Sequence, residues 1–320
     1  MKKIFTLFIA TIAIALTSCR GKEAPVDLVN QLDIAKVEVV AIEGHLHGKY
    51  GFHETADPKD QVHMKRFNKF VFVRKANGSM ELDPSSVQKL CVTGGVGQHV
   101  DHDEHAEEHE GHHHHDESEA GSVYGMWIDY FDAQGNKITD KVLGGENGKH
   151  RQHFFVPRGI KPTFDGDQKT IDQHKEINQF MTYVYCDTDP LSARIKDGAK
   201  VSGETNPIGY KGYLGFFVPR SEFTLEVVLS DVGSEGKSSA FWKALPTNKT
   251  LMKLAIPVVV YADYRETVES ETMEELTEAD RKYLESIAHA YGITTEEALK
   301  ALLNRVYGDV PPHSDAGYWF

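Results

Sequence analysis

Apolar and polar residues alternate along most of the chain up to about residue 265, with the period of two that is typical of β-strands. Segments of this kind, rich in Val, Ile, Phe and Tyr, lie at 37–44, 69–75, 124–132, 223–231 and 254–263. In the fourth segment every odd position from Phe223 to Leu229 is apolar and most even positions are polar, which predicts a half-buried antiparallel strand. Gly135 and Asn136 predict a hairpin turn after the third segment.

The pentapeptide FFVPR occurs twice, at 154–158 and 216–220. A true internal repeat would place two related β-sandwich units in tandem. A match of five residues also arises by chance, or from similar edge-strand chemistry, because proline is tolerated at a strand end. We therefore predict a mainly β protein with one or two antiparallel β-sandwich units, the first at 34–165 and a second β unit at 166–268.

The pattern changes to a period of 3.6 in the last section, 269–320. One helical stripe is formed by apolar residues: Leu276, Tyr283, Leu284, Ile287, Ala288 and Tyr291. Gly292 ends this stripe, and Thr294 and Glu297 have the spacing of a capping box for a second helix. Because monomers rarely leave such stripes exposed, packing on the second β unit is favoured over an apolar face for a partner.

The first residues have the composition of a secretory signal: Lys2 and Lys3, an apolar run at 4–16, then Thr, Ser and Cys19. The stretch 16–19 resembles the bacterial lipobox, although an ordinary signal peptide with a chance cysteine is an alternative. The resemblance implies a signal at 1–18, lipid on the Cys19 thiol, a linker at 19–33 and a membrane-attached protein of the cell envelope. Arg20 follows the cysteine in place of an aspartate, which in many Gram-negative lipoproteins implies sorting to the outer membrane, with the facing side left open.

The formal charge of the whole chain is −13 and becomes −15 once Lys2 and Lys3 are removed. Such an acidic surface argues against nucleic-acid binding, which needs a basic footprint. No later apolar run reaches membrane-spanning length, so the lipid would be the membrane anchor. Cys91 and Cys186 would then remain, and the sequence allows either a disulfide or two free buried thiols.

A histidine-rich acidic tract at 99–118 lies in a predicted disordered insertion at 98–121, and it holds eight of the seventeen histidines. These are His99, His102, His105, His109, His112, His113, His114 and His115. The spacings of three and four would put imidazoles on one face of a transient helix. Imidazole and carboxylate ligands suit zinc, and also copper or nickel. A polar loop that binds metal only incidentally is the alternative.

The tract is similar in composition to the histidine-rich acidic loops of solute-binding proteins from bacterial zinc-uptake transporters. This resemblance covers about twenty residues, and the rest of the chain does not look like the α/β lobes of those proteins. It implies metal handling and carries over neither a fold nor a high-affinity site. A loop of this kind concentrates ions locally but cannot impose a selective geometry.

A selective site would need histidines on ordered elements. His45 and His47 alternate along a predicted strand and would therefore share one face. His53, Glu54 and His63 are close enough in sequence to complete the coordination. His150 and His153 form a second pair before the first FFVPR, which strand pairing would bring close. The alternative is that these histidines lie on an edge strand or turn and bond to the backbone.

The sequence gives less support to other classes of function. The HLH at 45–47 resembles the HxH of metal-dependent amidohydrolases, whose implied fold is an α/β barrel, but the alternating helices are missing. HExxH, GxSxG and P-loop motifs do not occur either, so a non-enzyme is expected. Haem or carbohydrate binding is another alternative, although Trp127, Trp242 and Trp319 are scattered.

We therefore expect a lipid-anchored envelope protein that captures or buffers a transition metal, zinc first, and passes it to a metal-uptake transporter. The tract would raise the local ion concentration. An ordered cluster of His45 and His47, with His53 and His153 as further ligands, would select the ion.

Overall fold

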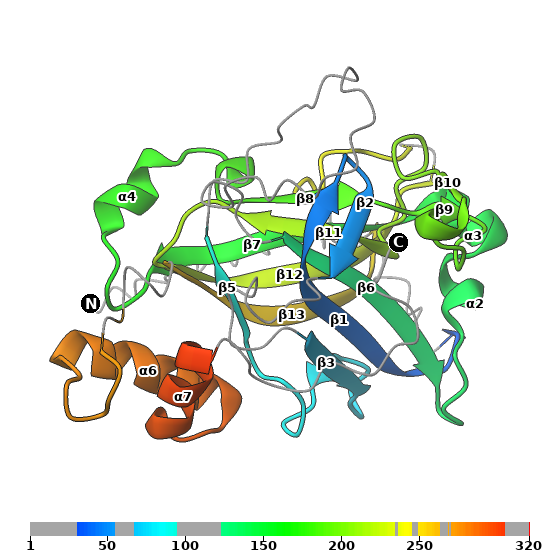
Figure 1. Cartoon of the computed structure of the whole chain (residues 1–320). Helices are drawn as coiled ribbons and strands as arrows, with labels where there is room; N and C mark the ends of the chain where they lie inside the picture. Colours follow the sequence, from blue (N-terminus) through cyan, green and yellow to red (C-terminus); the bar gives the residue numbers. More distant parts are fainter. Residues whose placement is uncertain are drawn as a thin grey trace, which may run out of the picture.

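The computed structural model of the chain (Figure 1) describes residues 31–54, 67–94, 123–233, 236–244, 249–262, 268, 270–304 and 320. Within these residues the strands form two main sheets. The larger has the order β4 (Met80–Leu82), β3 (Phe67–Arg74), β1 (Ile34–His47), β6 (Val123–Asp132), β11 (Lys211–Phe216) and β8 (Met181–Tyr185), with β2 (Gly51–Glu54) also paired to β1. The smaller has the order β5 (Leu90–Thr93), β13 (Thr250–Tyr261), β12 (Ser221–Asp231) and β7 (Arg151–Pro162).

The remaining described elements are short. A two-stranded ribbon pairs β9 (Thr188–Asp189) with β10 (Lys200–Val201). The helices are α2 (Thr139–Leu143), α3 (Gly145–His150), α4 (Gln168–Gln173), α6 (Glu278–Tyr291) and α7 (Thr295–Asn304), with 3-10 turns at Ile177–Gln179 and Ile195–Asp197. The mainly β fold predicted from the alternation is confirmed, because each of the five predicted segments falls wholly or largely on a strand. The pairings are antiparallel except that of β5 with β13.

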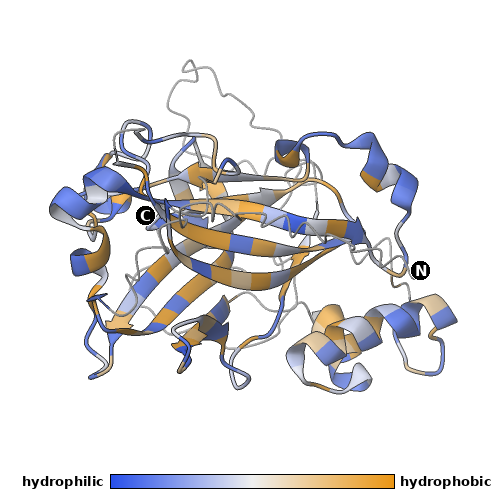
Figure 2. Cartoon of the chain, turned by 180° about the vertical axis from the view of Figure 1, so that it is seen from behind, coloured by the Kyte–Doolittle hydropathy of each residue, from blue (hydrophilic) through white to orange (hydrophobic). Residues whose placement is uncertain are grey.

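The two main sheets pack face to face and share one hydrophobic core. The inward positions follow the period of two: Val37, Val39 and Ala41 on β1, alternate residues from Tyr124 to Tyr130 on β6, and Phe223 to Leu229 on β12. Figure 2 shows hydrophobic and hydrophilic positions alternating along the long strands. Burial of each large apolar side chain stabilises the fold by about 1.5–3 kcal/mol, which explains why these strands associate.

Both sheets contain strands from either side of residue 165. In the larger sheet β6 pairs with β11, and in the smaller sheet β7 pairs with β12. The predicted units at 34–165 and 166–268 therefore share one sandwich, and the boundary at 165 does not separate two of them. The two FFVPR copies also differ in environment. The first lies inside β7, whereas Phe216 ends β11 and the rest of the second copy forms the connection to β12.

The turn predicted after β6 is present. The Asp132 carboxylate accepts the backbone N–H groups of Gln134 and Asn136 at 3.0 and 2.8 Å, and Gly135 has a φ of +83°. The expected second strand is reduced to a single bridge between Phe131 and Lys137, because the chain then enters α2.

The two predicted C-terminal helices pack on the outer face of the smaller sheet, as expected. Tyr283, Leu284 and Ile287 of α6 share a cluster with Val259 and Tyr261 of β13. Helix α6 ends at Gly292 in the left-handed conformation, with a φ of +67°.

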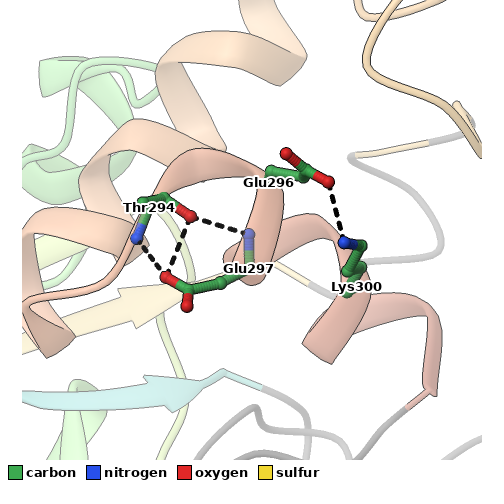
Figure 3. Close-up of polar contacts among 4 residues, drawn as sticks. All are labelled: Thr294, Glu296, Glu297 and Lys300. Carbon is green, nitrogen blue, oxygen red and sulfur yellow. Dashed lines mark hydrogen bonds and ion pairs between the residues drawn. The ribbon is translucent and has the colours of Figure 1, made fainter.

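The capping box at the start of α7 is also confirmed (Figure 3). The Thr294 N–H donates to Glu297 Oε2 at 2.8 Å, and the Glu297 N–H donates to Thr294 Oγ1 at 3.1 Å. Helix α7 packs its Ala298, Leu299 and Leu302 into the same cluster as α6. Neither these helices nor any other helix in the described ranges is long and apolar enough to cross a membrane. The predicted signal, lipobox and Cys19 lie outside the described residues.

Candidate functional site

The β1–β2 hairpin carries the predicted ordered histidines. Its register pairs His45 with His53, Leu46 with Phe52, and His47 with Gly51. Residues directly opposite in an antiparallel pair have Cβ atoms about 4.5–5.5 Å apart. The backbone therefore brings position 45 next to position 53, with position 47 one alternation further along the same face. The side chains of His45, His47 and Glu54 lie outside the described part of the structure, as does all of His63.

The alternation of side chains along β1 shows which face of the sheet positions 45, 47 and 53 occupy. Val37, Val39 and Ala41 point into the core between the sheets, and Glu43 continues the same row with only 1% of its surface exposed. Positions 45 and 47 are the next two places in this row, with position 53 beside them. We call Glu43, His45, His47 and His53 the histidine row. It extends the inner face of β1 beyond the end of the core.

The opposite face of the hairpin is packed against the outer surface of the larger sheet. Leu46 and Phe52 join a cluster with Ile42, Tyr213 and Phe320. A Cβ on Gly44 or Gly125 would lie 2.4–2.8 Å from atoms of the Phe52 ring, so these glycines leave room for it. This packing fixes which way the hairpin faces.

The histidine-rich tract belongs in sequence to the connection between β5, which ends at Thr93, and β6, which begins at Val123. Val123 is the register partner of Gly44, and Tyr124 is the partner of Glu43. The Thr93 N–H donates to the Tyr124 hydroxyl at 3.4 Å, which joins the two ends of the insertion. Val123, the first described residue after the insertion, thus lies beside the start of the histidine row on β1. The eight histidines from His99 to His115 lie outside the described residues.

Glu43 is a candidate ligand that the sequence reasoning missed. It stands in an otherwise apolar run, and its inward parity was the signal that distinguished it from a solvent-facing strand residue. Thr93 and Asn68, the latter paired through its backbone with Ala41, are also buried at this corner of the sandwich. A carboxylate beside imidazoles is a donor set that zinc accepts.

The second predicted pair, His150 and His153, is not brought to this row. His150 ends α3 and is exposed. His153 lies near Tyr130, whose register partner on β1 is Val37. Position 37 is eight residues from His45, or roughly 26 Å along a strand.

The chemistry of His153 also argues against a metal ligand. Its Nδ1 is 3.2 Å from the Ile208 carbonyl, which can only accept, so Nδ1 carries the proton. Nε2 is therefore the acceptor for the Tyr130 hydroxyl at 2.5 Å. Burial lowers the pKa of His153 to about 3 and keeps the ring neutral. Both ring nitrogens are thus engaged within the protein.

A second buried polar cluster surrounds Asp187. Its carboxylate accepts the backbone N–H groups of four successive residues, from Ile208 to Lys211, at 2.8–3.3 Å. Lys211 donates to the Ala193 carbonyl and Lys237 to the Pro207 carbonyl, and burial lowers the pKa of both lysines to about 8. These polar groups hold the backbone at 207–211 and at Ala193. The cluster is therefore a structural one.

Within the described residues no three His, Cys, Asp or Glu side chains are grouped closely enough to hold a metal ion. The tract, His63 and the side chains of His45 and His47 lie outside that set. Cys91 and Cys186 form no disulfide with each other and are buried in different clusters, which decides between the two states that the sequence allowed. Trp127 and Trp242 also lie in different clusters, and Trp319 is not among the described residues.

The chain was compared with known proteins, and no family model, curated protein or solved structure matches it.

Proposed function

We propose that this protein captures or buffers a transition metal, zinc first, at the outer end of the sandwich. The tract at 99–115 collects ions, and the histidine row selects one of them. The observation that carries the proposal is the register: Val123, where the insertion ends, pairs with Gly44, and His45 pairs with His53. The described residue that follows the tract is thus next to the start of the histidine row, which supports a role for both groups at the same end of the sandwich.

The two groups have different chemical roles. The tract offers many interchangeable imidazoles and carboxylates, so it binds ions weakly and releases them. The row offers His45, His53 and Glu43 from a paired hairpin, where the backbone limits the number of arrangements. Three protein ligands and an open fourth position let an ion enter and leave, which suits transfer to a transporter.

Zinc titration by calorimetry tests the two groups separately. We expect several ions to bind the full chain and one tight ion to remain after deletion of 98–118. In the deletion background, His45→Ala combined with His53→Ala should abolish the tight ion. His289→Ala is the matched control, because His289 is exposed on α6. Absence of zinc binding to the full chain, or a tight ion that survives the double substitution, would contradict the proposal.

Glu43→Gln tests the carboxylate that the structure adds to the row. The amide keeps the size of the side chain and removes its charge. We expect the zinc affinity of the deletion protein to fall about 10- to 100-fold, the range typical of residues that ligate or orient a metal. Unchanged affinity would exclude Glu43 from the site.

We further propose that the protein is held at a membrane of the cell envelope by lipid on Cys19, and that it supplies a metal-uptake transporter. Cys19→Ser should move the protein from the membrane fraction to the soluble fraction and abolish labelling with a radioactive fatty acid. Retention in the membrane fraction with no loss of label would contradict this anchor.

A further inference from the structure

Phe320 lies far from the helix that precedes it in the sequence. Helix α7 ends at Asn304 and packs over the outer face of the smaller sheet. Phe320 instead belongs to the cluster on the outer face of the larger sheet, with Ile42 and Tyr213. Figure 1 shows α7 and the end of the chain on opposite sides of the molecule. The last residue is thus placed against the β1–β2 hairpin.

The Phe320 side chain occupies a formed socket. It is 5% exposed, and its ring stacks on Phe52 with centroids 5.1 Å apart and planes 20° apart. The backbone carbonyl of Phe320 accepts the N–H of Ile195. Phe52 in turn fills the space above Gly44 and Gly125. The two rings form a stack from the sheet outwards.

The hairpin needs such support because it extends beyond the sheet. β3 pairs with β1 only up to Ile42, and β6 pairs with it only up to Gly44. From position 45 to 47, β1 pairs with β2 alone among the described strands. An isolated two-stranded hairpin is marginally stable in water.

Polar contacts of the hairpin turn also connect it to the rest of the protein. Tyr213 donates its hydroxyl to the Lys49 carbonyl at 3.1 Å, and Lys49 forms an exposed ion pair with Glu204 at 2.5 Å. Exposed pairs contribute little to stability. The Phe320 ring adds an apolar contact through its stack on Phe52, and stacked ring pairs contribute to stability beyond their buried area.

We propose that Phe320 is a latch: its ring, seated on Phe52, holds the β1–β2 hairpin against the larger sheet and so positions His45 and His53. Phe320 acts through Phe52 and is a positioning residue. The effect on the hairpin is independent of any metal. The consequence for zinc rests on the proposed function.

Hydrogen exchange of the full chain, without metal, tests the latch directly. In Phe320→Ala we expect amides in 44–54 to exchange about tenfold faster, whereas amides in the core strands at 124–131 and 254–260 keep their rates. Phe320→Leu should restore most of the protection, because it refills the socket with an apolar group. Phe164→Ala is the control, since Phe164 is 51% exposed. Equal exchange at 44–54 in the wild type and Phe320→Ala would overturn the latch.

Measurements of zinc affinity, combined with hydrogen exchange, distinguish a failure of the latch from a failure of the proposed function. In the deletion of 98–118, Phe320→Ala should weaken the tight ion about tenfold, with recovery in Phe320→Leu. If the wild type binds no zinc while Phe320→Ala still exchanges faster at 44–54, the proposed function fails and the latch stands. If zinc binds tightly and hairpin exchange is unchanged, the latch fails and the proposed function stands.

Discussion

The Tyr130 hydroxyl donates a hydrogen bond of 2.5 Å to His153 Nε2, and this bond crosses the core between the two sheets. Tyr130 lies on β6 of the larger sheet and His153 on β7 of the smaller one. Because His153 Nδ1 also bonds to the Ile208 carbonyl, the neutral ring is satisfied on both sides. His153, which the sequence suggested as a metal ligand, therefore joins the two sheets.

Stability should fall in mild acid because of His153. Burial lowers its pKa to about 3 in the folded protein, against about 6.5 in the unfolded chain. The unfolded state therefore binds the proton first, and stability is lost as the pH falls below about 6.5. Between pH 7 and pH 5 we expect the free energy of unfolding attributable to this group to drop by about 2 kcal/mol. Urea denaturation at the two pH values measures the drop.

The matched variants for this measurement are His153→Gln and Tyr130→Phe. His153→Gln should lose about 2 kcal/mol of the pH dependence, because the titrating group is gone. Tyr130→Phe should be less stable at both pH values but keep the dependence, since the histidine remains buried. A pH dependence that is equal in His153→Gln and the wild type would show that His153 is not its source.

Asp187→Asn should strongly destabilise the fold. The Asp187 carboxylate accepts hydrogen bonds from four backbone N–H groups. The side-chain amide of an asparagine would turn its own NH2 donors toward some of these N–H groups, which would then lack an acceptor. Leaving buried donors unsatisfied costs about 1–3 kcal/mol each, so we expect a loss of at least about 3 kcal/mol in urea denaturation. Asp132→Asn is the comparison, because Asp132 accepts backbone N–H groups in an exposed turn and should lose less than about 1 kcal/mol. Equal losses of stability in Asp187→Asn and Asp132→Asn would contradict the larger cost that burial imposes at Asp187.

Thr294→Ala should weaken α7 through loss of its capping box (Figure 3). The Thr294 hydroxyl accepts the Glu297 N–H and contacts the Glu297 carboxylate at 2.9 Å. Removal of an N-cap side chain typically costs about 1 kcal/mol. Lys300→Ala, which breaks only the exposed pair with Glu296, should cost about 0.5 kcal/mol or less. Amide exchange in 295–303 reports both changes, and equal exchange in the two variants would argue against the cap.

Gly125→Ala should disturb the hairpin through Phe52. The added Cβ would lie 2.4 Å from the Phe52 ring, so the ring has to move from its place. We expect faster amide exchange at 44–54 and a loss of about 1–3 kcal/mol in stability, as for other overpacked sites. Gly215→Ala is the control in the same sheet, because its nearest contact is the Thr182 methyl group at 3.2 Å. Similar exchange at 44–54 in both variants would show that Phe52 tolerates displacement.

Local patterns were sufficient for five of the strands and for the two C-terminal helices. Alternation identified β1, β3, β6, β12 and β13, and Thr294 with Glu297 marked the start of α7, because a cap depends on residues only three apart. The row of Val37, Val39 and Ala41 could likewise be assigned to one face, because side-chain alternation is a property of the strand alone.

Tertiary structure decided which strands are partners, since pairing depends on packing between distant segments that alternation does not encode. It merged the two predicted β units into one sandwich, buried His153 against Tyr130, and placed His45 opposite His53, close to Val123 at the start of β6. It also brought Phe320 to Phe52, a contact between residues that are far apart in the chain and follow no common period.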